Sequence, residues 1–207
     1  MALEELLNKL PDRMYINKKS DNHIFTPFKI AKEMIEALPD DIWSTQTTFL
    51  DICCKSGIFL YLIYEKLMNS IDMIKEIPDE KDRKQYIIEK QLFGICPDTM
   101  CKLASTRILC GAVNANCNII SLDNNYTNII TNTDKSFLYE TLEREFNDMK
   151  RFGVVIGNPP YNNDAYLEFV QVGHKLASKY TVMITPAKWQ AKGGGRTTSF
   201  VKKLCLI

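Results

Sequence analysis

The 207-residue sequence has only two histidines and no cysteine pair spaced as CxxC, so it lacks the usual ligand pattern of a zinc site. Its longest apolar run, 58–64, is too short to cross a bilayer. The N-terminal segment 1–13 has no signal-peptide core and carries acidic residues early, which argues against secretion. No GxGxxG fingerprint is present, which disfavours a nicotinamide-dependent dehydrogenase. We therefore expect a cytoplasmic protein with no membrane partner.

Charge and cysteine content narrow the class further. Lys and Arg total 26 and Asp and Glu total 25, so the net charge of +1 excludes a polybasic tail protein. Nucleic-acid binding through a local basic patch stays open. The seven cysteines are odd in number and mostly lie in apolar sequence, which favours small core residues in a reducing compartment. The length suggests one domain that can bury its own core.

Short apolar segments alternate with helical patterns along the chain. Strands are predicted over 47–54, 92–96, 117–121, 153–157 and 180–185. Helices are predicted over 27–38, 58–69, 98–110, 135–150 and 165–178. Loops are predicted over 70–84, leading into a solvated helix to about residue 90, and over 124–134. The alternation predicts an α/β fold, a mostly parallel sheet with helices on both faces. Ahead of it we expect a short amphipathic helix over 1–10 and an irregular polar segment over 11–25.

Ligands of open parallel sheets bind at the carboxyl ends of the strands, so the residues after each strand matter most. The first predicted strand is followed by Asp51, a turn with Ser56 and Gly57, and a helix. Gly57 lets the backbone approach a ligand closely, and a helix N-terminus supplies free N–H groups. A plain strand–turn–helix connection is the alternative. The second helix begins after Thr26, which we expect to cap it.

The fourth predicted strand runs into Asn158-Pro159-Pro160-Tyr161. The two prolines fix the backbone and remove two N–H donors. The side-chain oxygen of Asn158 and the carbonyl groups of Asn158 and Pro159 can then accept hydrogen bonds from an amino group. Tyr161 offers a flat face for stacking a planar ring. These features favour a substrate with an amino group on a planar ring, and a rigid turn without chemistry is the alternative.

The order of Phe-Thr-Pro at 25–27, DxxxxSGxF at 51–59 and GNPPY at 157–161 resembles the amino-group DNA methyltransferases that use S-adenosylmethionine, in particular the adenine methyltransferases of restriction–modification systems. The resemblance runs from residue 23 to the end. It implies a Rossmann-like methyltransferase domain over 23–207, a three-layer sandwich, preceded by a lead over 1–22. It also implies DNA as partner, with a flipped adenine as substrate and no metal.

Residue roles follow from the same resemblance. The catalytic residues would be Asn158, Pro159, Pro160 and Tyr161. Cofactor-binding residues would be Phe25, Thr26, Asp51, Ser56, Gly57, Phe59, Asp98 and Asp123. Lys55 replaces a glycine of the family and can either crowd the cofactor or point outward. Cys96 occupies the place of an acid that binds ribose hydroxyls, so Asp98 is the expected substitute, while Asp123 is equally compatible with a turn.

The last part of the chain gives weaker signals. Lys188, Lys192 and Arg196 are candidates for contacts with DNA phosphates, and a solvated loop is the alternative. The chain ends soon after the fifth predicted strand, whereas the family's domain continues with two more strands and a target-recognition region. We therefore expect the last two strands to be missing from this chain. Three explanations stay open: it is the cofactor-binding part of a longer protein, a naturally truncated remnant, or one piece of a split enzyme whose separate chain supplies the missing strands and target recognition. Two further functions stay open: methylation of RNA or of a protein glutamine, and a remnant without catalysis.

Overall fold

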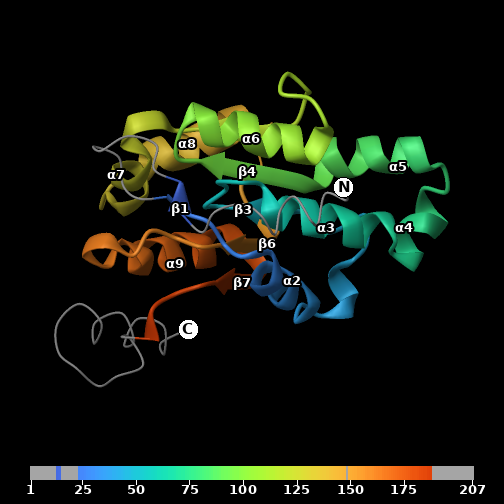
Figure 1. The fold of residues 1–207 in the computed structure, drawn as a ribbon, viewed down its shortest axis with the longest axis horizontal. Coiled ribbons are helices and arrows are strands. Elements are labelled where there is room, and N and C mark those ends of the chain that lie inside the picture. Colours follow the sequence, from blue (N-terminus) through green and yellow to red (C-terminus); the bar gives the residue numbers. More distant parts are fainter. Residues whose placement is uncertain (1–12, 15–22, 148, 188–207) are drawn as a thin grey trace.

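The computed structural model describes residues 13–14, 23–147 and 149–187. At its centre is a parallel sheet of five strands in the order β5-β4-β3-β6-β7 (Figure 1). The strands are β3 (Phe49–Asp51), β4 (Leu92–Cys96), β5 (Asn118–Ser121), β6 (Phe152–Gly157) and β7 (Ala177–Met183). All five predicted strands are present, so the predicted α/β class is confirmed. β7 forms one edge of the described sheet.

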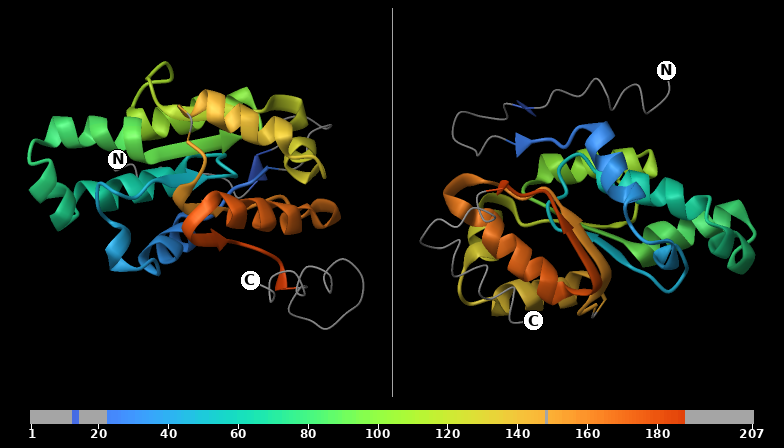
Figure 2. Two further views of the ribbon diagram at one scale, coloured as in Figure 1. Left: turned by 180° about the vertical axis from the view of Figure 1, so that it is seen from behind. Right: turned by 90° about the horizontal axis from the view of Figure 1, so that it is seen from below.

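Helices cover both faces of the sheet, as Figure 2 shows from two sides. One layer holds α2 (Phe28–Glu36), η1 (Asp40–Ile42), α3 (Ile58–Met68) and α6 (Thr99–Cys110). The other holds α7 (Tyr126–Thr131), α8 (Ser136–Glu145) and α9 (Ala165–Leu176). Side chains of β6 divide between the two layers, because Val154 and Ile156 pack with the first and Val155 packs with the second. This two-sided burial explains why the strand sequence is apolar throughout.

The predicted loop over 70–84 is wrong, whereas the helix predicted to follow it is present and ends near residue 90 as expected. The segment contains α4 (Ile71–Glu76) and α5 (Glu80–Tyr86), which continues into a π-helical turn, η2 (Ile87–Gln91). The side chain of Asp79 caps α5 by accepting a hydrogen bond from the backbone N–H of Asp82. Buried Arg83 donates to the carbonyl groups of Met68, Ile77 and Pro78. The proline between the helices separates them, and tertiary contacts hold both in place.

The predicted loop over 124–134 is also wrong. A 3₁₀ turn, η3 (Asp123–Asn125), leads into α7, whose Tyr126 and Ile130 are buried. The many Asn and Thr residues favour a loop locally, but these two apolar contacts with the core override that preference.

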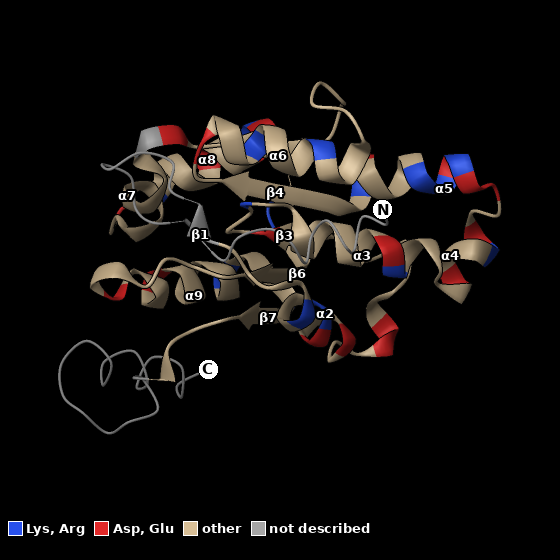
Figure 3. Ribbon diagram, viewed as in Figure 1, with Lys and Arg blue, Asp and Glu red and all other residues tan. Residues whose placement is uncertain are grey.

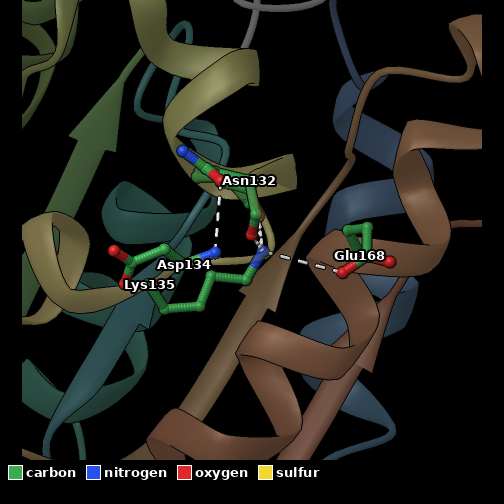
Figure 4. Close-up of polar contacts among 5 residues, drawn as sticks. Asn132, Asp134, Lys135 and Glu168 are labelled. Carbon is green, nitrogen blue, oxygen red and sulfur yellow. Dashed lines mark hydrogen bonds and ion pairs between the residues drawn. The ribbon is translucent and has the colours of Figure 1, made fainter.

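A polar contact joins this helix region to α9. The Nζ atom of Lys135 donates to the carbonyl groups of Ile130 and Asn132 and forms an ion pair with Glu168 at 3.6 Å (Figure 4). The side chain of Asn132 accepts from the backbone N–H of Asp134. Together these contacts connect the end of α7, the start of α8 and the first turn of α9.

The N-terminal lead differs in part from expectation. Within the segment predicted to be irregular, β1 (Arg13–Met14) pairs antiparallel with β2 (His23–Ile24). The helix predicted over 1–10 lies outside the described residues, and a domain boundary after residue 22 stays a prediction. Among the helices that the structure describes, none combines the length and apolar character needed to cross a bilayer.

The packing of α7 gives a direct test of the corrected region. Ile130 is fully buried, whereas Asn128 on the same helix is exposed. We expect Ile130→Ala to lower the free energy of unfolding by about 2–5 kcal/mol, because it leaves a cavity in the core. Asn128→Ala should change it by less than about 0.5 kcal/mol. Denaturant unfolding of both variants measures the difference, and equal stabilities would mean that this segment is a surface loop.

Candidate functional site

The candidate site lies where β3 and β6 end. These strands are parallel neighbours with Asp51 paired to Ile156, so the loops that follow them begin side by side. A third segment, the residues just before α2, joins them. The resulting pocket is lined by Phe25, Thr26, Asp51, Cys53, Lys55, Ser56, Gly57, Ile58, Phe59 and Asn158. Three segments far apart in the sequence therefore meet at the carboxyl ends of β3 and β6.

Six of the eight residues predicted to bind a cofactor line this pocket, together with Asn158 of the predicted catalytic turn. The pocket has a volume of about 10 Å³, roughly the space of one water molecule. A larger ligand enters it only when lining side chains move. The structure thus brings the predicted residues together in a closed arrangement.

Asn158 connects all three segments. Its Nδ2 donates to Oγ1 of Thr26 at 3.2 Å, and its Oδ1 accepts from the hydroxyl of Tyr161 at 2.8 Å. Its main-chain carbonyl accepts from Nζ of Lys55 at 3.2 Å. Thr26 was expected to cap α2, but the structure records no side-chain cap there, and its hydroxyl binds Asn158 instead. The side chain of Asn158 is buried, so these bonds fix its orientation.

The loop after β3 packs against α6, which contacts it through Ser105. Gly57 has φ +77°, and a Cβ atom there would lie 3.0 Å from Cα of Ser105. The hydroxyl of Ser105 donates to the carbonyl of Lys55 at 3.3 Å. At the start of the loop, the carboxylate of Asp51 accepts from the backbone N–H of Cys53 at 2.9 Å. Only glycine combines this left-handed conformation with so close an approach to the helix.

Three residues that hold this loop were not predicted as site residues. Lys55 was left with two possible orientations, and the structure shows that it points inward, toward Asn158. The buried hydroxyl of Tyr126 donates to the carbonyl of Ile52 at 2.6 Å. Ser105 and Tyr126 come from a helix interior and from a predicted loop, where no local signal marks them.

Burial governs the electrostatics of the site. It raises the pKa of Asp51 to about 7, although the Cys53 N–H and the Lys55 ammonium favour the charged carboxylate. Burial also lowers the pKa of Lys55, while nearby groups including Asp51 oppose that change. A carboxylate and an ammonium are therefore both partly removed from water beside the pocket.

The two remaining cofactor candidates, Asp98 and Asp123, follow other strands of the sheet and lie outside the pocket. Asp98, after β4, caps α6 by accepting from the backbone N–H of Cys101 at 2.7 Å. Asp123, after β5, accepts from the hydroxyl of Thr99 at 3.0 Å. Neither lines the pocket, although both follow strands at the same edge of the sheet. Cys96 is fully buried with Sγ 3.9 Å from the Ser105 hydroxyl, so it packs in the core as predicted for the cysteines.

The candidate DNA contacts Lys188, Lys192 and Arg196 lie outside the described residues. On the face drawn in Figure 3, the described Lys and Arg residues are interspersed with Asp and Glu.

Comparisons with known proteins find methylases similar to this chain. Residues 90–165, which include the Asn158–Tyr161 turn, match the family model of the Eco57I restriction-modification methylase. The chain is 26% identical to an "uncharacterized adenine-specific methylase" of Mycoplasma pneumoniae, over 90% of this chain and 61% of that protein. It therefore spans less than two thirds of the length of that relative.

Solved structures share the fold at low sequence identity. The modification subunit of a putative type I restriction enzyme from Vibrio vulnificus YJ016 matches with a TM-score of 0.58 and 15% identity, over 92% of this chain and 39% of that one. The M protein of the type I restriction enzyme EcoKI matches with a TM-score of 0.60 and 15% identity, over 87% and 37%.

The chain shares the fold of these modification subunits. The predicted resemblance to adenine-specific methylases of restriction–modification systems is confirmed. The roles of individual residues remain predictions.

The buried carboxylate of Asp51 predicts a pH dependence of stability. Its pKa is about 7 in the folded protein and near 3.8 in the unfolded chain, so between these values the folded state holds a proton that the unfolded state has lost. The free energy of unfolding should therefore fall as pH rises from about 4 to about 7, by on the order of 3 kcal/mol from this group. In Asp51→Asn, whose Oδ1 can still accept from Cys53, that contribution should vanish.

Urea unfolding of the wild type and Asp51→Asn, measured from pH 4 to pH 8, gives the difference directly. The variant should gain stability relative to the wild type as pH rises. Parallel curves for the two proteins would show that the Asp51 carboxyl ionises as freely in the folded state as in water.

Proposed function

We propose that this chain transfers a methyl group from S-adenosylmethionine to the 6-amino group of adenine in DNA, as part of a restriction–modification system. The observation that carries the proposal is the position of Asn158. It follows β6, the neighbour of the central strand β3, lies in the segment matched by the methylase family model, and lines the same pocket as the predicted cofactor residues.

The groups around the pocket fit the chemistry of this cofactor. The Asp51 carboxylate complements the positive charges of its sulfonium and ammonium groups, and the hydroxyls of Thr26 and Ser56 suit its polar end. Phe25 and Phe59 supply apolar surface. Asp98, which follows β4, and Asp123, which follows β5, are our candidates for the ribose and the adenine ring. When bound, the cofactor supplies an electrophilic methyl group.

The catalytic turn would act by positioning its substrate. A base inside a duplex cannot reach this edge of the sheet, so the adenine must be flipped out. Its amino group would displace the Tyr161 hydroxyl from Oδ1 of Asn158 and donate there and to the carbonyl of Pro159. These two acceptors increase electron density on the amino nitrogen and hold it in line for transfer. The ring of Tyr161 would stack on the base.

Target recognition would come from elsewhere. The chain covers 61% of its Mycoplasma relative, so a further segment or a separate chain is our candidate for reading the DNA sequence. Lys188, Lys192 and Arg196 remain candidates for phosphate contacts.

Calorimetric titration with S-adenosylmethionine, followed by methyl-transfer assays on DNA, tests the proposal. We expect a dissociation constant of about 1–100 μM, or roughly −8 to −5.5 kcal/mol. Asn158→Ala should lower methyl transfer by about 100-fold or more, because it removes an acceptor of the amino group. Its cofactor affinity should stay within about threefold of the wild type, since the other lining residues remain.

Three outcomes would contradict the proposal. No binding at millimolar cofactor would identify a remnant without catalysis. Methylation of RNA or of a protein glutamine in place of DNA would assign another substrate. Equal turnover by Asn158→Ala would remove that residue from the reaction.

The hydroxyl and the ring of Tyr161 can be separated by mutation. Tyr161→Phe keeps the ring and frees Oδ1 of Asn158, so we expect kcat to remain within about threefold and KM for DNA to be unchanged or lower. Tyr161→Ala removes the stacking surface and should raise KM for DNA by about 5- to 100-fold. Steady-state kinetics on one DNA substrate compares them. Equal losses in both variants would show that the hydroxyl itself is needed in the reaction.

A further inference from the structure

We propose that Lys55 is a positioning residue for methyl transfer, whose ammonium holds the Asn158–Pro159 peptide group in its working orientation. The inference rests on the proposed function and adds a residue that takes the place of a glycine in the resembling family. It assigns to Lys55 a contact across the pocket, between the loop after β3 and the turn after β6.

The geometry begins with the sheet. β3 and β6 are paired in parallel, so Lys55 and Asn158, each a few residues or less beyond its strand, lie on facing loops. Nζ of Lys55 lies 3.2 Å from the carbonyl oxygen of Asn158, within hydrogen-bond distance although the residues are 103 positions apart in the sequence. The other end of the Lys55 residue is also held, because its own carbonyl accepts from the hydroxyl of Ser105 on α6.

The catalytic turn needs such an external donor. Pro159 and Pro160 have no N–H groups, so this part of the turn cannot be held by its own backbone donors. Its orientation depends on what binds its carbonyl groups. The carbonyl of Asn158 belongs to the peptide group that precedes Pro159, so fixing its direction also limits the direction of the next carbonyl, that of Pro159. That carbonyl is one of the two acceptors proposed for the target amino group.

The charge of Lys55 strengthens this contact. A hydrogen bond from an ammonium group is stronger than one between neutral groups, and partial burial reduces competition from water. The Asp51 carboxylate beside it favours the charged ammonium. Because Lys55 occupies the carbonyl of Asn158, the acceptors left for the substrate are Oδ1 of Asn158 and the carbonyl of Pro159.

The alternative is that the Lys55 side chain blocks the cofactor pocket, a role we call a plug. The pocket encloses only about 10 Å³, and Lys55 is among the residues that line it. A plug must leave before the cofactor binds, so its removal would raise cofactor affinity. A positioning residue must stay, so its removal would lower kcat and leave cofactor affinity nearly unchanged. The two roles therefore predict different kinetic effects.

The experiment compares the wild type with Lys55→Met, Lys55→Arg and the control Lys84→Met, which removes an exposed lysine from α5. We expect Lys55→Met to lower kcat by about 10- to 100-fold while the dissociation constant of S-adenosylmethionine, measured by calorimetry, changes by less than about threefold. Lys55→Arg keeps a cationic donor and should recover at least about a third of wild-type kcat. Lys84→Met should match the wild type.

A second readout needs neither cofactor nor turnover. Hydrogen exchange of the backbone amides of residues 161–164, measured on the protein alone, should be faster in Lys55→Met and close to wild type in Lys55→Arg. Melting temperatures of all variants identify any general loss of folding. If the wild type neither binds the cofactor nor transfers methyl groups, the proposed function fails, and the exchange data still decide whether Lys55 holds the turn.

Two results would overturn the inference. The first is tighter cofactor binding by Lys55→Met with unchanged or higher kcat, which would identify a plug. The second is unchanged amide exchange over residues 161–164 in a folded Lys55→Met protein, which would show that the turn does not depend on the ammonium.

Discussion

The parallel pairing of β3 with β6 at the centre of the sheet is the constraint on which the rest of the site depends. It places the loop that begins after Asp51 beside the turn that begins at Asn158. A slip of two residues would keep both strand faces buried but would separate these loops. The apolar side chains of the strands supply the burial energy, whereas Tyr126 and Ser105 hold the loop after β3 and Lys55 joins that loop to the turn after β6. The core thus sets the distance between the loop after β3 and the turn after β6, and a few hydrogen bonds set their orientation.

Much of the fold was predictable because strand signals in this chain are strong and local. The five apolar segments and the helices between them follow from periodicity alone. The two segments that were predicted wrongly depend on distant partners. Arg83 stabilises α5 through carbonyl groups of α3 and of the connection after α4, and Tyr126 stabilises α7 through the carbonyl of Ile52. Composition favours loops in both places, and no local pattern reports such contacts.

In the candidate site too, some features were predictable from the sequence and others depend on contacts between distant residues. Residues in the three motifs were predicted from the resemblance to the adenine methyltransferases, and the structure brings six of the predicted cofactor residues into one pocket. The hydrogen bonds that join these motifs were not predictable. They depend on how loops that lie over 100 residues apart in the sequence are positioned relative to one another in the folded protein. Thr26 illustrates the difference. Its sequence position favours a helix cap, but in the folded protein its hydroxyl accepts a hydrogen bond from Asn158 instead.

The separation of these contacts in the sequence has a consequence during synthesis. Lys55 leaves the ribosome 103 residues before Asn158, which corresponds to about 5–20 s at ordinary translation rates. Until β6 has emerged and docked beside β3, the nascent chain has a loop without the turn that faces it. The pocket therefore forms late, so a nascent chain cannot hold a ligand there before β6 is complete.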